Sequence, residues 1–430
     1  MKFSQLGQLA LASAVSAALV LGITACGQSN TIDFVYVSSA GNSTTGNIYA
    51  YAADGESGAL SQIVGSPFPT GRNPIALLTS PNNQFLYALN HDDNTVVEYS
   101  VGSDGKLYSQ NTYNPKSGTN PNGMAISPDG KRLYVVEAYG LDPNNNPYSA
   151  TTPGVGALVV FPINANGTLG TETSYQTCNN PVAVSAVHDG SALYVVNDPA
   201  GQLTTLIDTV AQQNRGATGN STVIYPTVGN CSGGANAVGQ ISSFVVNADG
   251  TLSPGSGSPF RAGVAPVGIA TDPTSRFTYV IDYRQNQILS YSIQPGGLLE
   301  PLVNSNQTTG QLPSAITVDP RGMFIYVTNY GGGAVSGYAL NAVTGVPSTL
   351  AGSGSAATDV GPAAVIIEDS IGRYIYTANF VGNSTSGLYL DPNAGTTSQV
   401  QNSPFPGAAK ATAVASVKHG DHAIQVNPSY

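Results

Sequence analysis

The stretch Pro121–Val136 reads PNGMAISPDGKRLYVV and contains the unit from which most of the chain is built. A proline leads a short apolar run, the turn Ser127–Lys131 follows, and a second apolar run contains Tyr134. Two short apolar runs joined by a Pro-Asp-Gly turn are typical of a pair of antiparallel strands. The stretch Pro313–Asn329, PSAITVDPRGMFIYVTN, repeats the same order. A unit that recurs in this way predicts a repeat protein.

Seven copies of the unit follow one another from about Ile32 onward. A tyrosine marks the second strand of each copy: Tyr36, Tyr87, Tyr134, Tyr194, Tyr279, Tyr326 and Tyr376. Another aromatic residue follows in the third strand: Tyr51, Tyr99, Phe161, Phe244, Tyr291, Tyr338 and Tyr389. Because aromatic side chains bury large areas, we interpret both sets as packing between neighbouring sheets.

A second turn, as in Asn164–Leu169 and Asn247–Leu252, adds a fourth strand to the unit. Seven units of four antiparallel strands predict an all-β fold, a seven-bladed β-propeller, because a ring of such sheets buries faces that a single sheet would expose. The run Ala411–Ala415 looks like one more first strand, which the first copy lacks. We therefore predict that this C-terminal strand completes blade 1 and closes the ring, with residues 32–430 as one domain.

The repeat resembles the YVTN-type propeller repeats and the seven-bladed lactonase-like family that includes phosphogluconolactonase. The likeness rests on stretches such as Leu133–Val136 and Ile325–Asn329, and it covers residues 31 to about 420. It implies a propeller and, as an activity, the hydrolysis of a lactone. Members often carry His or Arg directly after the proline of the first strand, where this chain has Ile75, Asn122, Val182, Val267, Ser314 and Ala363.

Charged residues are sparse: they make up 9% of the 430 residues, and the formal net charge is −10. Nucleic-acid binding needs a clustered basic surface, so 14 Lys and Arg spread along the chain argue against such a partner. A hydrophobic content of 41% is enough for a packed core. The shortage of basic residues also argues against a phosphorylated sugar as the ligand.

The N-terminal residues 1–26 are predicted to be a lipoprotein signal peptide. The run Leu6–Leu21 is almost wholly apolar or small, and Ile23–Gly27 (ITACG) resembles a bacterial lipobox with Cys26 as the lipidated residue. An ordinary signal peptide with an incidental cysteine is the alternative. With residues 27–31 as a tether, we expect an exported protein that is lipid-anchored in the cell envelope, on the periplasmic face, in the outer membrane or at the cell surface.

Two long insertions, at 138–156 and 198–239, are predicted to rise from one face of the ring. Strand direction alternates within a blade, so this face, here named the top face, carries the loops between blades and those from second to third strands. The remaining turns share the bottom face. Such insertions are either lids or surface decoration.

In an oxidising compartment, we expect Cys178 and Cys231 to form a disulfide that holds the second insertion over its own blade; two free thiols are the alternative.

Polar residues of the top face form the predicted ligand site. They are Arg72, Asn73, Asn90, His91, Asp92, Asn122, Asp198 and Asn329. His91, Asp92 and Asp93 have metal-ligand chemistry, but one histidine beside two acids is a weak pattern, so we expect a solvated turn, no metal and no cofactor. The expected partner is a small molecule or an envelope protein, and the expected state is a monomer.

Nucleophile motifs such as Gly-x-Ser-x-Gly and His-Glu-x-x-His are absent from the sequence. The first hypothesis is therefore a binding protein without catalysis. The alternative is a lactone hydrolase in which Glu137 or Asp282 activates water and Arg284 or Arg72 stabilises the oxyanion. A surface or adhesion module is a second alternative, suggested by a weakly charged chain rich in Ser, Thr and Asn.

Overall fold

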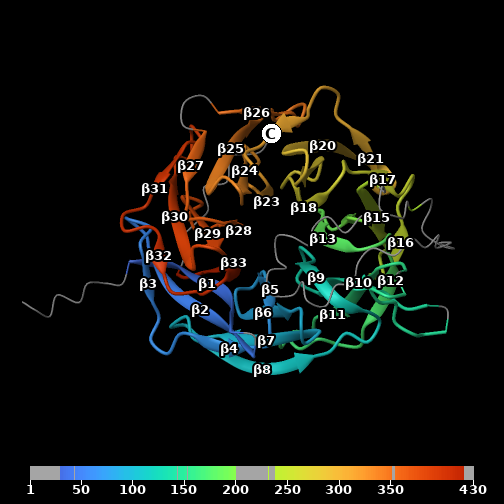
Figure 1. The fold of residues 1–430 in the computed structure, drawn as a ribbon, viewed down its shortest axis with the longest axis horizontal. Coiled ribbons are helices and arrows are strands. Elements are labelled where there is room, and N and C mark those ends of the chain that lie inside the picture. Colours follow the sequence, from blue (N-terminus) through green and yellow to red (C-terminus); the bar gives the residue numbers. More distant parts are fainter. Residues whose placement is uncertain are drawn as a thin grey trace, which may run out of the picture.

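The computed structural model describes residues 30–42, 44–142, 144–152, 154–199, 231, 238–350 and 354–420, which form seven antiparallel sheets arranged as blades around a centre (Figure 1). The predicted seven-bladed all-β propeller is confirmed. Outside the described residues lie the predicted signal peptide with Cys26, the first part of the tether, nearly all of the 198–239 insertion and residues 421–430. Among the described residues, no helix is long and apolar enough to cross a membrane.

The strands of blades 1 to 4 are given in order from the centre outward. Blade 1 consists of β33 (Ala411–Lys418), β1 (Thr31–Asn42), β2 (Thr45–Asp54) and β3 (Leu60–Gln62), with β4 (Phe68–Thr70) beside β2. Blade 2 consists of β5 (Pro74–Thr79), β6 (Phe85–Asn90), β7 (Thr95–Val101) and β8 (Leu107–Tyr113). Blade 3 consists of β9 (Thr119–Ile126), β10 (Arg132–Tyr139), β11 (Ala157–Pro162) and β12 (Thr173–Gln176). Blade 4 consists of β13 (Pro181–Ala186), β14 (Ala192–Asn197), β15 (Gln240–Val246) and β16 (Leu252–Pro254), with β17 (Phe260–Arg261) beside β15.

Blades 5 to 7 follow the same order. Blade 5 consists of β18 (Pro266–Thr271), β19 (Phe277–Asp282), β20 (Gln287–Gln294) and β21 (Leu298–Pro301), with the short helix η2 (Pro295–Gly297) before β21 and with β22 (Gln307–Thr308) beside β20. Blade 6 consists of β23 (Pro313–Val318), β24 (Phe324–Asn329), β25 (Ala334–Leu340) and β26 (Pro347–Thr349), with β27 (Ser355–Ala357) beside β25. Blade 7 consists of β28 (Pro362–Ile367), β29 (Tyr374–Asn379), β30 (Ser384–Leu390) and β31 (Thr397–Gln399), with β32 (Phe405–Pro406) beside β30.

Five blades carry a short fifth strand that was not predicted. After the fourth strand the chain turns back and pairs with the beginning of the third strand, as β4 does with β2 and β32 does with β30. Two Gly-Ser-Pro-Phe stretches, Gly65–Phe68 and Gly257–Phe260, and a near copy at Asn402–Phe405 form this return in blades 1, 4 and 7, each with a cis Ser-Pro peptide bond. The linker to the next blade therefore leaves from the top face.

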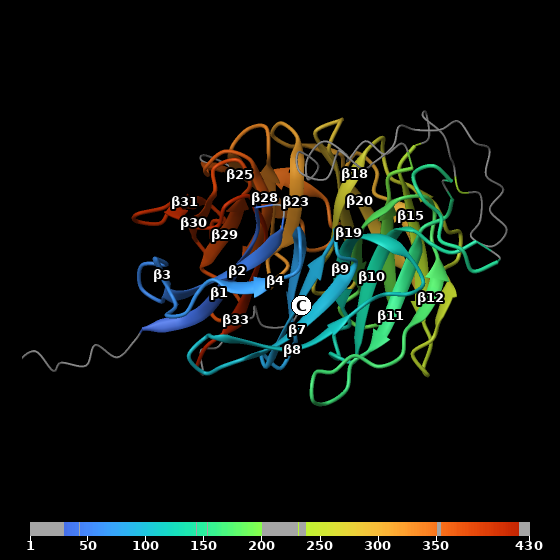
Figure 2. The same cartoon turned by 60° about the horizontal axis from the view of Figure 1, so that its bottom comes forward.

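The C-terminal strand closes the ring as predicted (Figure 1, Figure 2). β33 pairs antiparallel with β1, so that Tyr36 lies opposite Ala415 and Val37 lies opposite Val414. It occupies the place of a first strand, in contact with β5 of blade 2 and β28 of blade 7. Blade 1 is therefore assembled from both ends of the described chain, and its main-chain hydrogen bonds hold the ring shut.

The repeated tyrosine of the second strand ties one blade to the next. Tyr326 in blade 6 is buried, and its hydroxyl donates a hydrogen bond to the carbonyl of Gly395 in blade 7 (2.8 Å). Blades 1, 2, 5 and 7 make equivalent bonds to Gly105, Gly167, Gly345 and Gly58. Gly395 has a φ of 70°, and a Cβ there would lie 2.4 Å from the ring of Phe324, so the turn requires glycine. The predicted packing of these tyrosines between sheets is confirmed.

The prediction for one aromatic residue of blade 7 is wrong by one position. β30 pairs Leu388 with Ile375, and Leu388 is fully buried. Tyr389 is 38% exposed and packs edge-on against Tyr374. Because side chains alternate between the two faces of a strand, a shift of one residue moves the ring out of the core.

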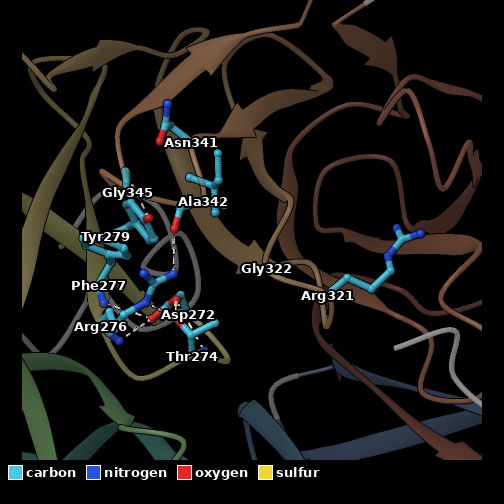
Figure 3. A pocket seen from close by; sticks show the side chains of 11 residues that line it. Asp272, Thr274, Arg276, Phe277, Tyr279, Arg321, Gly322, Asn341, Ala342 and Gly345 are labelled. Carbon is cyan, nitrogen blue, oxygen red and sulfur yellow. Dashed lines mark hydrogen bonds between the residues drawn. The ribbon is translucent and has the colours of Figure 1, made fainter. Parts of the chain in front are cut away.

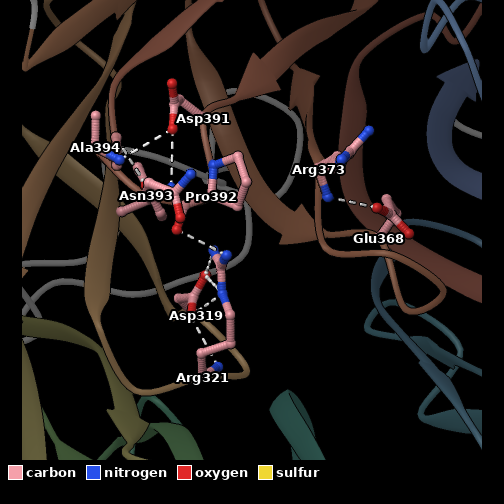
Figure 4. Close-up of polar contacts among 10 residues, drawn as sticks. Asp319, Arg321, Glu368, Arg373, Asp391, Pro392, Asn393 and Ala394 are labelled. Atoms are coloured by element: carbon pink, nitrogen blue, oxygen red, sulfur yellow. Dashed lines mark hydrogen bonds and ion pairs between the residues drawn. The ribbon is translucent and has the colours of Figure 1, made fainter. Parts of the chain in front are cut away.

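Most first-to-second-strand turns at the bottom face are held by the side chain of their first residue (Figure 4). Asp319 accepts the main-chain N–H of Arg321 and pairs with its guanidinium, which also donates to the carbonyl of Pro392 in blade 7. The corresponding turn of blade 7 is one residue longer, and it begins with the longer side chain of Glu368. Glu368 accepts the N–H of Arg373 at 2.6 Å, so the extra methylene group matches the extra turn residue.

Candidate functional site

The second strand of every blade carries a polar residue at or near its top end, three positions after its tyrosine. These residues are Ser39, Asn90, Glu137, Asn197, Asp282, Asn329 and Asn379, and all are buried. Four of the predicted site residues therefore occupy one repeated structural position.

The asparagines at this position join the second strand to the third. Asn90 donates to Thr95 Oγ1 (3.2 Å) and accepts from Thr70 Oγ1 (3.0 Å). Asn329 donates to Ser336 Oγ (2.9 Å). These contacts give Asn90 and Asn329 a structural role, and their predicted role in ligand binding stays a prediction.

Asp282 holds the linker that enters blade 5. Its fully buried carboxylate accepts the main-chain N–H groups of Val264 (2.6 Å), Arg284 (3.0 Å) and Gln285 (3.0 Å). A carboxylate with three such donors has little capacity left to accept a proton from water. The side chain of Arg284 belongs to an exposed residue of the turn, and Arg284 meets Asp282 through its main chain. The geometry thus gives Asp282 a structural role, while catalysis by this pair remains a prediction.

Glu137 differs from the other residues at this position. It is fully buried, and among the described residues neither of its carboxyl oxygens has a hydrogen-bond partner. Burial raises the pKa of Glu137 to about 8, and the negative charge of Glu172 adds to the shift. At neutral pH the carboxyl group is therefore mostly protonated. A general base must reach the proton that it abstracts, and this burial keeps Glu137 away from the surface.

A polar cluster of blade 2 lies at the top face and consists of Arg72, Asn73, His91, Asp92 and Asp93. His91 Nδ1 lies 2.8 Å from Asp92 Oδ1, which also accepts a hydrogen bond from Asn73 Nδ2 (3.1 Å). The bond with His91 is the main cause that lowers the pKa of Asp92. Arg72 Nε lies 2.5 Å from Asp93 Oδ1, and the Arg72 side chain is 46% exposed. The structure thus brings four of the predicted ligand residues together on one blade.

Asparagines at or just before the first strands of blades 2, 3 and 4 have a left-handed backbone conformation. Asn73, Asn120 and Asn180 have φ values of 49°, 60° and 48°. Asparagine adopts this left-handed region more readily than most residues with a side chain. Asn122 donates to the carbonyl of Pro181 (2.8 Å) and so connects blade 3 to blade 4. These roles coexist with the predicted ligand role of Asn73 and Asn122, which the structure does not test.

The residue directly after this polar position lies at the top face in each blade, and the seven such residues are here named the rim. The rim residues are Ala40, His91, Ala138, Asp198, Tyr283, Tyr330 and Phe380. In six blades the N–H of the rim residue bonds to the carbonyl of the residue before the first strand, as in His91 to Asn73 (3.0 Å) and Tyr330 to Leu312 (2.9 Å). The rim is polar at blades 2 and 4 and aromatic at blades 5, 6 and 7. Sequence reasoning missed the aromatic part, although its signal is present: a ring four positions after the strand tyrosine.

The predicted disulfide is present: Cys178 and Cys231 are bonded, with their Cα atoms 5.5 Å apart. Cys178 is buried shortly before β13, and its N–H donates to Ser242 Oγ of β15 (3.2 Å). The bond therefore attaches residue 231 of the second insertion to the top of blade 4, close to the rim residue Asp198, which is itself fully buried.

A family model described as "Lactonase, 7-bladed beta-propeller" matches residues 34–137 and 226–351. The chain belongs to this family. Its fold is similar to that of a putative 6-phosphogluconolactonase from Bacteroides uniformis (17% identity, TM-score 0.67) and of a periplasmic gluconolactonase from Pseudomonas aeruginosa (16% identity, TM-score 0.66). The likeness covers 90% and 91% of this chain and 100% of each of the other two. No curated protein matches the sequence.

This lactonase-family protein also has a small pocket on its bottom face, between blades 5 and 6 (Figure 3). Arg276 lies along the pocket: its guanidinium donates to the carbonyl of Ala342 (2.7 Å) and lies 5.2 Å from the centre of the Phe277 ring. Arg321 points away from the other lining residues. The basic groups of the pocket are thus engaged by neighbouring turns. In the part of the chain that the structure describes, no group of three or more His, Cys, Asp or Glu side chains could hold a metal ion.

Proposed function

We propose that this lactonase-family protein is a cell-envelope lipoprotein that binds a small, uncharged, hydroxyl-bearing ring at the rim of its top face. The observation that carries the proposal is the division of the top face, with His91 and the exposed Asp92 on blade 2 and the half-buried rings of Tyr283 and Tyr330 on blades 5 and 6. A ligand with one apolar face and several hydroxyl groups matches this division, because aromatic rings cover apolar surface while the carboxylate of Asp92 accepts hydrogen bonds from hydroxyl groups.

Charge on the top face supports a ligand without phosphate. The guanidinium of Arg72 is already paired with Asp93, and Asp92 carries a negative charge beside it. Phosphate recognition relies on Arg or Lys groups that are available for bidentate contacts. A phosphorylated ring is therefore expected to bind more weakly than the same ring without phosphate.

The proposed lipid anchor orients the ligand site. Second strands run from the bottom face to the top face, so β1 enters the ring at the bottom, where Thr31 begins it. A tether of residues 27–31 spans at most ~17 Å when extended. If Cys26 carries the lipid, the bottom face lies near the membrane and the rim faces away from it. Membrane fractionation tests the anchor: the protein should remain with membranes, and the Cys26→Ser variant should not.

Titration calorimetry of the chain without residues 1–26 tests the rim, with glucose, glucose 6-phosphate and glucono-1,5-lactone as probes. We expect the uncharged rings to bind at least tenfold more tightly than the phosphate. Tyr330→Ala should weaken their binding about tenfold, because it removes one of the aromatic rings of the rim. Tyr389→Ala, on the outer part of blade 7, is the matched control and should leave binding unchanged. Equal binding by both variants, or preference for the phosphate, would contradict the proposal.

Lactone hydrolysis is the second candidate function, and the contact between His91 and Asp92 favours it. A carboxylate that holds one ring nitrogen of a histidine fixes the orientation of the imidazole, which is a common arrangement for a general base. Hydrolysis of glucono-1,5-lactone that is lost in His91→Gln but kept in Glu137→Gln and Asp282→Asn would assign the base to His91. Loss in either carboxylate variant, with the fold intact, would favour the predicted carboxylates instead.

A further inference from the structure

The seam where blade 7 meets blade 1 contains acidic side chains on both sides. Asp33 lies near the beginning of β1, and Glu368 and Asp369 lie in the turn between β28 and β29. Asp33 and Glu368 are fully buried. The seam is also where the two ends of the described chain are joined, because β33 pairs with β1 there.

One main-chain N–H brings the two buried carboxyl groups together. The N–H of Ser370 donates to Glu368 Oε2 (2.8 Å) and also to Asp33 Oδ2 (3.2 Å). Two carboxyl oxygens on the same hydrogen lie close to each other, and two carboxylates at that separation cannot both be ionised in a buried site. The second oxygen of Asp33, Oδ1, has no hydrogen-bond partner within the described part of the chain. A single proton held between the carboxyl groups of Asp33 and Glu368 therefore explains how both can be buried so close together.

The other blades show that this pair is particular to the seam. Asp33 lies three positions before the tyrosine of its second strand. In blades 2 to 7 that position holds Gln84, Lys131, Ser191, Arg276, Met323 and Arg373. This position holds an acid only in blade 1, where the ring closes. The pair of Asp33 and Glu368 is therefore not required by the repeat itself.

The surroundings of the pair supply few positive groups. On β33, Lys418 lies opposite Asp33, and the ring of the next residue, His419, packs at a tilt against Phe34. Arg373 meets Glu368 through its main-chain N–H (Figure 4). Asp369 acts on Asp33 as a further negative charge, and burial together with the charges of Glu368 and Asp33 raises the pKa of the neighbouring Tyr376. Burial raises the pKa of Asp369 to about 6, against the effect of a hydrogen bond with Ser416.

We propose that a proton shared by Asp33 and Glu368 holds the ring-closing seam, so that the seam is tightest in acid and loosens as the pH rises. The direction follows from linkage: burial, followed by the contact with Glu368, raises the pKa of Asp33 to about 10. A group whose pKa is raised by folding stabilises the fold fully below its unfolded value and loses that contribution as the pH rises through its folded value. Asp369 acts in the same direction, and its smaller contribution is already lost as the pH rises through about 6.

Hydrogen exchange of the strand amides, corrected for intrinsic rates, tests the proposal between pH 5 and pH 10. In the wild type, protection of β33 and β1 should fall at least tenfold over this range relative to β24 in blade 6. Asp33→Asn keeps a hydrogen-bond donor toward Glu368 without a titrating group, so above about pH 6, where Asp369 adds no further change, its seam should exchange independently of pH. Asp391→Asn, in an exposed turn of blade 7, is the control and should behave as the wild type.

A second variant protects the test against a failure of Asp33→Asn to fold. Glu368→Gln removes the other partner and should flatten the same pH profile. Seam protection that is constant with pH in the wild type, or a pH-dependent loss that is equal in β24, would overturn the proposal. Since the readout is exchange in the absence of ligand, it is independent of the function proposed for the rim.

Discussion

Replacing Glu137 by Gln should make the protein more stable at neutral and alkaline pH. The carboxyl group is buried without a partner, and its pKa is raised to about 8 from an ordinary value of 4.5. The contribution of this group to stability is complete below pH 4.5 and is lost as the pH rises through 8. At pH 7 the free energy of unfolding of the wild type is therefore about 3 kcal/mol lower than it would be with the group protonated in both states. Gln has nearly the same shape and does not titrate. Denaturant unfolding at pH 5, 7 and 9 should show an advantage of Glu137→Gln that grows with pH.

Asp282→Asn is the matched comparison for this experiment, because Asp282 occupies the same position in blade 5. Its carboxylate accepts several main-chain N–H groups, and an amide would turn one donor toward them. Asp282→Asn should therefore destabilise the protein by about 2 kcal/mol at pH 7. The interpretation of Glu137 as an unsatisfied buried acid fails if Glu137→Gln is no more stable than the wild type at pH 9.

Removal of the disulfide by Cys178→Ser together with Cys231→Ser should lower the free energy of unfolding by about 4 kcal/mol. The bond closes a loop with a sequence separation of 53 residues, and a cross-link of that span restricts the unfolded chain strongly. Because Cys178 is buried, the serine there also places a hydroxyl group in the core of blade 4. Urea unfolding of the oxidised wild type and the double variant measures the difference.

Reduction of the wild type provides the control for this prediction. With dithiothreitol present, the wild type should unfold at about the same urea concentration as the double variant, whose own midpoint should not move. If the reductant leaves the wild type unchanged although both thiols become free, the cross-link contributes little to stability. Ligand binding at the rim, measured on the same samples, shows whether the attached insertion also takes part in the site.

The repeat could be predicted because its signals are local. A proline before an apolar run and a turn of Pro, Asp, Asn, Ser or Gly residues recur in blades 2 to 7, a tyrosine in the second run recurs in all seven, and each signal acts within a few residues. The ring closure by Ala411–Lys418 followed from counting strands. The register of Tyr389 could not be obtained in this way, since Leu388 and Tyr389 are both suitable for a core position, and the pairing with Ile375 selects the leucine.

The candidate site was harder to predict because it depends on contacts between residues that are distant in the chain. Glu137 and Asp282 look alike in sequence, as acids at the end of a second strand. One is left without a partner and the other is surrounded by N–H donors of the linker. The rim aromatics were missed for a related reason. Tyr283 and Tyr330 come to lie on the same face as His91 only when the blades close into a ring.

The amino-acid order alone established a seven-fold repeat of four strands, its closure and the pairing of Cys178 with Cys231, because periodicity, turn chemistry and a scarcity of cysteines can be recognised without coordinates. The state of each polar group was settled only by folding. Whether Glu137, Asp282 or Asp33 is charged, bonded or exposed depends on burial and on donors from another strand or blade, and no pattern within a single repeat contains that information.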